Sequence, residues 1–105
     1  MSGGVGLLQV AREKMRTRHL AHRTEQAYLQ WIRRYVRFHQ RRHPRDLGAE
    51  GVERFLTHLA VDRKVSASTQ SQALQALLFL YRNVLGIELP WLENVTRANR
   101  PQRLP

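Results

Sequence analysis

Hydrophobic residues recur along this chain three or four positions apart, the spacing of one face of an α-helix. Four segments show the pattern, at about residues 5–18, 22–42, 49–62 and 67–85, and no segment alternates with the period of two that is typical of a strand. Short connections and one apolar stripe per helix predict an all-α fold, a small four-helix bundle with a short closing helix. In the first segment the stripe comprises Leu8, Ala11 and Met15, with Leu7 beside it.

The second segment combines a strong apolar stripe with a basic face. Pro44 disfavours helical geometry at His43, so we expect this helix to end there or slightly earlier. The turn PRDLG follows. The predicted inward side chains of this helix are Tyr28, Trp31, Ile32, Tyr35 and His39, with Phe38 at the edge.

The third and fourth segments also follow the helical period. Gly51 lies inside the third segment, where a glycine lowers the stability of a helix by roughly 1 kcal/mol relative to alanine. The fourth is expected to begin after Ser66, whose hydroxyl can accept from the amide of Thr69, with Ser68 as a rival cap. It should end at Gly86 in the left-handed conformation. The inward stripes are Val52, Phe55, Leu56 and Leu59 in the third segment and Leu74, Leu77, Leu78, Tyr81 and Leu85 in the fourth.

The two ends of the chain carry little that a core could bury. We expect a flexible leader at residues 1–6, the helical domain at 7–95 and a basic linker at 96–105, which holds three arginines and two prolines. Before that linker, Trp91 and Leu92 are expected to plug one end of the bundle. No apolar run reaches the length of a membrane span, and the first residues lack the pattern of a signal peptide.

Charge narrows the class of partner. The 105 residues include 18 Lys and Arg against 8 Asp and Glu, a formal net charge of +10, and only Lys14 and Lys64 are lysines. Arginine matches phosphate oxygens and guanine edges in a bidentate way that lysine cannot reproduce. These features predict a domain that binds a polyanion, usually nucleic acid, although a basic surface can also serve solubility alone. The absence of cysteine excludes disulfides and thiol chemistry and suits a cytoplasmic protein.

Two predicted helix faces carry polar groups that suit DNA. Arginine and glutamine fill the outer face of the second segment, while serine, threonine and glutamine fill that of the fourth, with no Asp or Glu between Lys64 and Ile87. An ordinary solvated helix face, the competing interpretation, usually mixes charges of both signs. Hydroxyls and amides near a helix N-terminus bind phosphate oxygens, and glutamine can reach the edge of adenine in a major groove.

Metal and catalytic sites find little support in the sequence. His19 and His22, and likewise His39 and His43, have spacings that can share a metal, but neither pair has a third ligand placed to complete a site. We therefore expect no metal and no cofactor, and we expect His39 to be a partly buried core residue. No phosphate-binding glycine loop, no GxSxG sequence and no paired carboxylates occur, so no catalytic residue is predicted.

Three stretches of the chain, taken in order, resemble a known family. RTEQAYLQWIRRYVRFHQRRHPRDLG, VERFLTHLAV and SASTQSQALQALLFLYRNVLGIELPWLENVTRANRPQRLP are similar to the N-terminal part of integron integrases, bacterial members of the tyrosine recombinase or phage integrase family. The resemblance covers roughly residues 7–105 and implies a SAM-like core-binding domain, an orthogonal helical bundle that acts in the cytoplasm at the bacterial nucleoid. It also implies that two helices face the major groove, while a separate catalytic domain closes the other side of a DNA clamp.

The resemblance implies DNA-facing residues at the positions that match the family pattern. The helical pattern and the resemblance agree best at Gln26, Ser68 and Gln72, whereas Gln70 lies off the line that joins Ser68 to Gln72. Members of the family often have a serine where this chain has Ala21, so the second helix needs another cap or has a looser first turn. The implied DNA-binding residues are Arg23, Thr24, Gln26, Gln30, Arg34, Lys64, Ser68, Thr69, Gln70, Gln72 and Gln75.

The resemblance also bears on activity and assembly. The chain stops at PQRLP, where members of the family continue into a catalytic domain with the nucleophilic tyrosine. We therefore expect this chain not to be an enzyme, but to bind a recombination site, double-stranded or folded from a single strand, without cutting it. The expected protein partners are its own catalytic domain and other protomers in the full-length protein, and in isolation we expect a monomer.

Two other functions stay open at this point. A free-standing helical regulator of nucleic acid would be supported by a compact helix-turn-helix, but the predicted connections are longer. A protein-interaction module would be supported by an apolar patch left exposed on the folded bundle. In a recombinase, such a patch could instead mark the missing domain or a neighbouring protomer.

Overall fold

A computed structural model describes residues 3–89 of the chain, with side chains from residue 6 onward. It contains four α-helices, α1 (Gly3–Thr17), α2 (His22–Phe38), α3 (Gly48–Val61) and α4 (Ala67–Phe79). A 3-10 turn, η1 (Pro44–Asp46), precedes α3, and a π-helical segment, η2 (Leu80–Leu85), continues α4. No strand occurs within residues 3–89, so the all-α prediction is confirmed.

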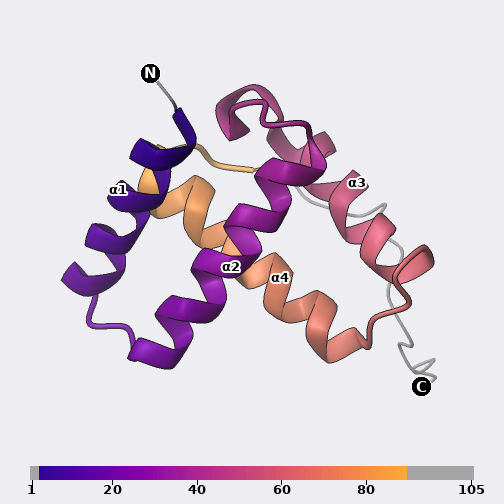
Figure 1. Cartoon of the computed structure of the whole chain (residues 1–105), viewed down its shortest axis with the longest axis horizontal. Coiled ribbons are helices and arrows are strands. Elements are labelled where there is room, and N and C mark those ends of the chain that lie inside the picture. Colours follow the sequence, from indigo (N-terminus) through magenta and orange to yellow (C-terminus); the bar gives the residue numbers. More distant parts are fainter. Residues whose placement is uncertain (1–2, 90–105) are drawn as a thin grey trace.

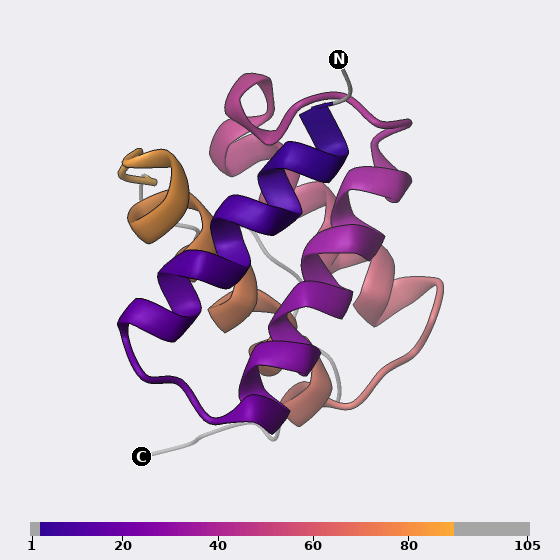
Figure 2. The same ribbon diagram turned by 60° about the vertical axis from the view of Figure 1, so that its left-hand side comes forward.

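The helices cross rather than lie parallel. α2 passes over α4 near the middle of the molecule, and α1 and α3 lie at opposite ends of its longest axis (Figure 1). The N-terminal ends of α2 and α4 lie at the same lower edge in two views that differ by 60° (Figures 1 and 2). The connections at residues 18–21 and 62–66 lead into these helix starts. The molecule therefore has one edge, here called the helix-start edge, formed by the beginnings of α2 and α4 and these two connections.

One hydrophobic core joins all four helices. Its α3 contribution follows the predicted stripe, and its α2 contribution follows the prediction except that Leu29, which was not predicted, is buried as well. The α3 residues Val52, Phe55, Leu56 and Leu59 are all buried. In α2, Trp31, Ile32 and Tyr35 are buried, while Tyr28 and Phe38 pack against the core from a partly exposed position. In α1, Leu7 is buried with Ala11 and Met15, and Leu8 is only partly buried, the reverse of the predicted order for the two leucines.

The inward face of α4 is rotated from the predicted stripe. Leu77 and Tyr81 are buried as predicted, but Leu74, Leu78 and Leu85 are partly exposed. Leucine offers more apolar area than alanine, so the sequence pattern favours the leucines, whereas small side chains suit a helix that another helix crosses closely. Where α2 crosses, the rings of Tyr28 and Phe79 meet edge to face at 6.0 Å. The residues buried in place of those leucines are Ala73, Ala76, Phe79 and Leu80.

The ends of α4 and its continuation follow the predicted local chemistry. Ser66 is the N-cap, because its Oγ accepts from the amide of Thr69 at 3.1 Å, and this confirms Ser66 over Ser68. After η2, Gly86 adopts the left-handed conformation with φ 68° and ψ 30°, as predicted. The amide of Ile87 then reaches back to the carbonyl of Tyr81 at 2.7 Å, which closes the helix end.

The bounds of α1 and α2 differ from the sequence prediction. α1 begins at Gly3 and so takes in residues 3–6, which were expected to be a flexible leader. α2 ends at Phe38, because Gln40 and Arg41 are both left-handed, with φ of 57° and 66°, and cannot continue a right-handed helix. The predicted plug at Trp91 and Leu92 and the linker at 96–105 lie outside the described residues.

A buried polar network holds the edge opposite the helix-start edge. Tyr35 contacts Tyr81 through their hydroxyls, and the Tyr81 hydroxyl donates to the carbonyl of Pro44. Nearby, Nε2 of His39 lies 3.0 Å from the carbonyl oxygen of Gly51. These bonds join α2, η1, α3 and η2, so the positions of four elements are set by specific polar contacts as well as by apolar packing.

Candidate nucleic-acid interface

The outer face of α2 presents five of the predicted DNA-binding residues. Arg23, Gln26 and Gln30 are exposed, and Thr24 and Arg34 are partly buried. The guanidinium carbon of Arg34 lies 4.5 Å from the centre of the Trp31 ring, a cation–π contact that holds the arginine above the core. A groove of about 300 Å³ runs along this face and is lined by Gln26, Ala27, Gln30, Trp31 and Arg34.

Glu25 is a buried carboxylate that the sequence analysis missed. Its side chain is only 5% exposed, and it lies 3.2 Å from Nε of Arg16 and 3.7 Å from Nδ1 of His22. The first turn of α2 has no side-chain cap at Ala21, so a carboxylate here also suits the positive end of the helix. Because Glu25 is the only acidic residue of α2 and points inward, the outer face of this helix carries no exposed negative charge.

The start of α4 presents a second polar surface. Ser68, Gln72 and Gln75 are exposed, and Thr69 is partly buried. The Thr69 hydroxyl also accepts from the hydroxyl of Ser66 at 3.1 Å, so this side chain belongs to the helix cap. Lys64, in the preceding connection, is exposed and left-handed with φ 52°. A lysine in a conformation that favours glycine costs backbone energy.

Gln70 is not part of this surface, and its prediction as a DNA-binding residue needs correction. Its side chain is 2% exposed, and Nε2 donates to the carbonyl of Leu56 in α3 at 2.9 Å. Helical spacing explains the difference, because position 70 lies on the inward side of α4 with Ala73 and Leu77. Gln70 therefore joins α4 to α3 rather than α4 to a ligand.

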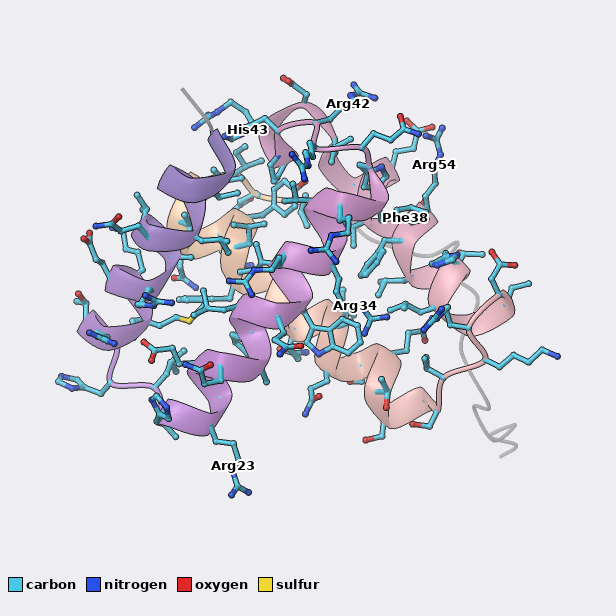
Figure 3. The ribbon with its side chains drawn as sticks, in the orientation of Figure 1. Arg23, Arg34, Phe38, Arg42, His43 and Arg54 are labelled. Atoms are coloured by element: carbon cyan, nitrogen blue, oxygen red, sulfur yellow. The ribbon has the colours of Figure 1, made fainter. Side chains whose placement is uncertain are left out.

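The structure brings five of the ten remaining candidates to the helix-start edge. Arg23 and Thr24 belong to the first turn of α2, and Ser68 and Thr69 to the first turn of α4. Figure 3 shows Arg23 pointing away from the bundle at the start of α2, with Arg34 farther along the same helix. Lys64 lies in the connection that enters α4. The edge thus combines two helix N-termini with cationic side chains, a combination that binds phosphate groups.

Gln75 lies in a separate groove beside two arginines that the sequence analysis did not single out. This groove has a volume of about 220 Å³ and includes Arg18 from the α1–α2 connection and Arg82 from η2. The signal was available only in three dimensions, since positions 18, 75 and 82 belong to different elements. The other side chains that line the groove are Leu20, Tyr28, Leu78, Phe79 and Asn83.

The histidines do not form a metal site in the part of the chain that the structure describes, where no group of three or more potential ligands occurs. His39 is 9% exposed, as expected for a core histidine, and burial lowers its pKa, as do nearby Arg54 and Arg42. His43 lies beyond α2, where Nδ1 accepts from the amide of Arg45 at 3.0 Å. None of the helices in residues 3–89 is long and apolar enough to cross a membrane.

The connection between α1 and α2 is shorter than expected. It consists of residues 18–21, a length that helix-turn-helix motifs use, so the expectation of longer connections was wrong here. α2 follows this turn and carries the arginine and glutamine face described above. The turn length therefore agrees with nucleic-acid binding through α2.

Comparisons with known proteins find one matching family and two similar proteins. Residues 7–91 match the model of the phage integrase N-terminal SAM-like domain. Two curated proteins named Integrase/recombinase, from Escherichia coli and Pseudomonas aeruginosa, are each 52% identical to the chain over 101 residues, which is 96% of its length. The chain spans about 30% of the length of these two relatives.

Proposed function

The chain belongs to the family of phage integrase N-terminal SAM-like domains, and on this premise we propose that it is the DNA-binding, core-binding domain of a site-specific tyrosine recombinase of the integron integrase type. In this proposal it forms one half of a clamp around a recombination site in the bacterial cytoplasm and contributes to DNA integration and recombination. Cutting and rejoining belong to a separate catalytic domain, and this chain binds without catalysis.

The observation that carries the proposal is the distribution of carboxylates over α2 and α4. The only acidic residue of α2, Glu25, is buried against Arg16, and α4 and η2 contain none. No exposed carboxylate therefore lies on either of the two crossing helices, whose starts share one edge (Figure 1). A DNA backbone would repel a carboxylate on this surface, whereas a face kept only for solubility gains from charges of both signs.

The candidate residues divide by chemistry. Arg23, Arg34 and Lys64 would neutralise phosphates, and the exposed hydroxyl of Ser68 and that of Thr69 would add phosphate contacts at the start of α4. Their role is to fix the position of the domain on the duplex. Base edges in the major groove would be read by amide side chains, namely Gln26, Gln30, Gln72 and Gln75.

An NMR titration of the labelled chain tests the proposal. The probes are a double-stranded recombination site and the same strand folded as a hairpin, each at two salt concentrations. We expect shifts at residues 23–34 and 64–75 that weaken steeply as salt rises, because phosphate contacts release counterions. Arg34→Ala should weaken binding several-fold, whereas Arg54→Ala, which removes an exposed arginine of α3, should leave it unchanged. Shifts confined to other surfaces would count against the proposal.

A free-standing regulator of nucleic acid is a second candidate. The four-residue turn between α1 and α2 favours it, because a single recognition helix after such a turn can bind DNA alone. That candidate requires α2 but gives α4 no role. The same titration separates the two candidates, because only the recombinase domain should show shifts at residues 64–75.

A further inference from the structure

The groove on the outer face of α2 combines two amide side chains with a small apolar surface. Gln26 and Gln30 are exposed and lie four positions apart in α2, and each is followed directly by an apolar residue, Ala27 or Trp31. All four line the groove of about 300 Å³, and Arg34 lines it as well. Trp31 is 7% exposed and Ala27 is partly buried, so these two side chains lie deeper than the amides. The groove therefore places hydrogen-bonding groups above an apolar base.

The arginine of this groove is held by the core. Its guanidinium carbon lies 4.5 Å from the centre of the Trp31 ring, and Arg34 is partly buried midway along α2 (Figure 3). An arginine reads guanine by turning two N–H groups toward O6 and N7 of the base, and stacking on an indole ring restricts that motion. The groups of the groove that are left to contact a base edge are the two amides.

The chemistry of these groups matches one kind of base pair. In the major groove an amide can donate to N7 of adenine and accept from its N6 amino group, whereas guanine presents two acceptors and cytosine only a donor. The one carboxylate of α2, Glu25, is buried, so no acid on this helix can accept from the cytosine amino group. Thymine, the partner of adenine, carries a methyl group on the same edge, and apolar side chains such as Ala27 contact it favourably.

The spacing of the two amides allows both to contact DNA at once. Four residues of an α-helix span about 6 Å, and neighbouring base pairs are about 3.4 Å apart. A helix that lies along the major groove would therefore bring Gln26 and Gln30 to base pairs two steps apart. Ala27 lies between them along the helix axis, opposite the intervening base pair.

We propose that the α2 groove selects a short run of three A·T base pairs. Gln26 and Gln30 each pair with an adenine, and Ala27 with the exposed part of Trp31 contacts a thymine methyl group. Arg34 contacts a phosphate beside the run. This inference rests on the proposed function, because it requires α2 to enter the major groove, and it adds the base pairs that the helix prefers there.

Base analogues that each remove one chemical group test the proposal. The probes are a recombination-site duplex and three versions of it: every thymine replaced by deoxyuracil, which lacks the methyl group; every adenine by 7-deazaadenine, which lacks the N7 acceptor; or every guanine by 7-deazaguanine. Fluorescence anisotropy measures the affinity of the full chain for each duplex. We expect the first two replacements to weaken binding about three- to tenfold, and the third to change it less than about twofold.

Variants of the chain assign these effects to the groove. The double variant Gln26→Ala, Gln30→Ala should reduce the effect of 7-deazaadenine to less than about twofold. Ala27→Ser, which places a hydroxyl where the apolar contact was, should reduce the effect of deoxyuracil in the same way. Arg23→Ala, the matched control, should weaken binding to all four duplexes by one common factor, because a phosphate contact carries no base preference. Circular dichroism of each variant checks that the fold is kept.

The outcomes separate this inference from the proposed function. Affinity that falls with salt and with Arg23→Ala, but does not respond to deoxyuracil or 7-deazaadenine, would overturn the A·T preference and leave DNA binding in place. Effects of the analogues that persist undiminished in the variants with Gln26, Gln30 or Ala27 replaced would overturn it as well, because another part of the surface would then read the bases. A chain that binds none of the duplexes would overturn both.

Discussion

Tyr35 of α2 and Tyr81 of η2 meet in the core with their hydroxyl oxygens 2.9 Å apart, and the Tyr81 hydroxyl lies 2.6 Å from the carbonyl oxygen of Pro44. A phenol has one hydrogen, and Tyr81 donates it to Pro44, so Tyr35 is the donor to Tyr81. Both side chains are fully buried. The two tyrosines therefore form a directed chain of hydrogen bonds from Tyr35 through Tyr81 to Pro44, and the backbone of Gly48 adds a further hydrogen bond to the Tyr81 hydroxyl.

Removing the two hydroxyls should have unequal effects. Tyr81→Phe leaves both the Tyr35 hydroxyl and the Pro44 carbonyl without their partner, so it should lower the free energy of unfolding by about 2–4 kcal/mol. Tyr35→Phe keeps the bond to Pro44 and should cost only about 1 kcal/mol. Urea unfolding followed by circular dichroism measures both. Equal losses would show that the direction of the chain is wrong.

The same pair should make the fold sensitive to alkaline pH. Burial raises the pKa of Tyr35, and the hydrogen bond to Tyr81 acts in the same direction; burial also raises the pKa of Tyr81. As the pH rises, the tyrosines of the unfolded chain therefore lose their hydroxyl protons before those of the folded chain. The free energy of unfolding is fully retained below about pH 10 and falls above it, by up to about 1.4 kcal/mol per pH unit for each tyrosine. Thermal melting between pH 8 and 11.5 should decline less steeply for Tyr35→Phe than for the unchanged chain.

Gly51 and Gly6 should respond oppositely to alanine. A Cβ at Gly51 would lie 2.6 Å from Cβ of Leu47 and 2.9 Å from the hydroxyl of Tyr35, so Gly51→Ala should destabilise by about 1–3 kcal/mol despite its better helix propensity. A Cβ at Gly6 in α1 meets nothing within 4 Å, and Gly6→Ala should stabilise by roughly 0.5–1 kcal/mol. Chemical unfolding of the two variants provides the comparison, and a stabilising Gly51→Ala would contradict the close packing.

Lys64 should show opposite effects on stability and on binding. Because its φ of 52° favours glycine, Lys64→Gly should stabilise the fold by roughly 1 kcal/mol. The same change removes a cation from the helix-start edge, so DNA affinity should fall and the salt dependence of binding should decrease by about one phosphate contact. Melting temperatures and fluorescence anisotropy at several salt concentrations test the two halves separately. Unchanged DNA binding would remove Lys64 from the proposed surface.

Gln70 and Gln72 lie two positions apart in α4, and Gln70 is buried whereas Gln72 is exposed, so they form a matched pair for mutagenesis. Gln70→Ala loses the bond to Leu56 and should cost about 1–3 kcal/mol of stability. Gln72 is exposed, so Gln72→Ala should change stability by less than about 0.5 kcal/mol while it weakens DNA binding. A large loss of stability in Gln72→Ala would place that residue in the core and remove it from the interface.

The sequence predicts some helices better than others for a physical reason. In α3, branched and aromatic residues occupy one narrow stripe, so Val52, Phe55, Leu56 and Leu59 are identified correctly. In α4, apolar residues surround the helix from Ala73 onward, and the pattern no longer selects one face. The π-helical turn at η2 rotates the following residues as well, and no periodicity of the sequence announces it.

The candidate site is limited by a different difficulty. Composition distinguishes polar from apolar residues, but it does not show which polar side chain a neighbour will bury. Glu25 and Gln70 are both buried because each has a polar partner on another element: Glu25 accepts a hydrogen bond from Arg16, and Gln70 donates one to the carbonyl of Leu56. Arg18 and Arg82 flank Gln75 only after three elements have packed together. Such relationships depend on tertiary contacts, so they require the structure.

The position of the buried polar network has a consequence for how such a domain can change over generations. Tyr35, His39, Gly51 and Tyr81 anchor the fold at one edge, and the candidate DNA contacts begin at the other. Exposed side chains at the helix-start edge, such as Arg23 and Gln72, can therefore be exchanged without disturbing the hydrogen bonds around Tyr81. Under the proposed function, such positions could change the preferred target site at little cost to the fold, whereas Lys64 and the capping residue Thr69 tie binding to stability.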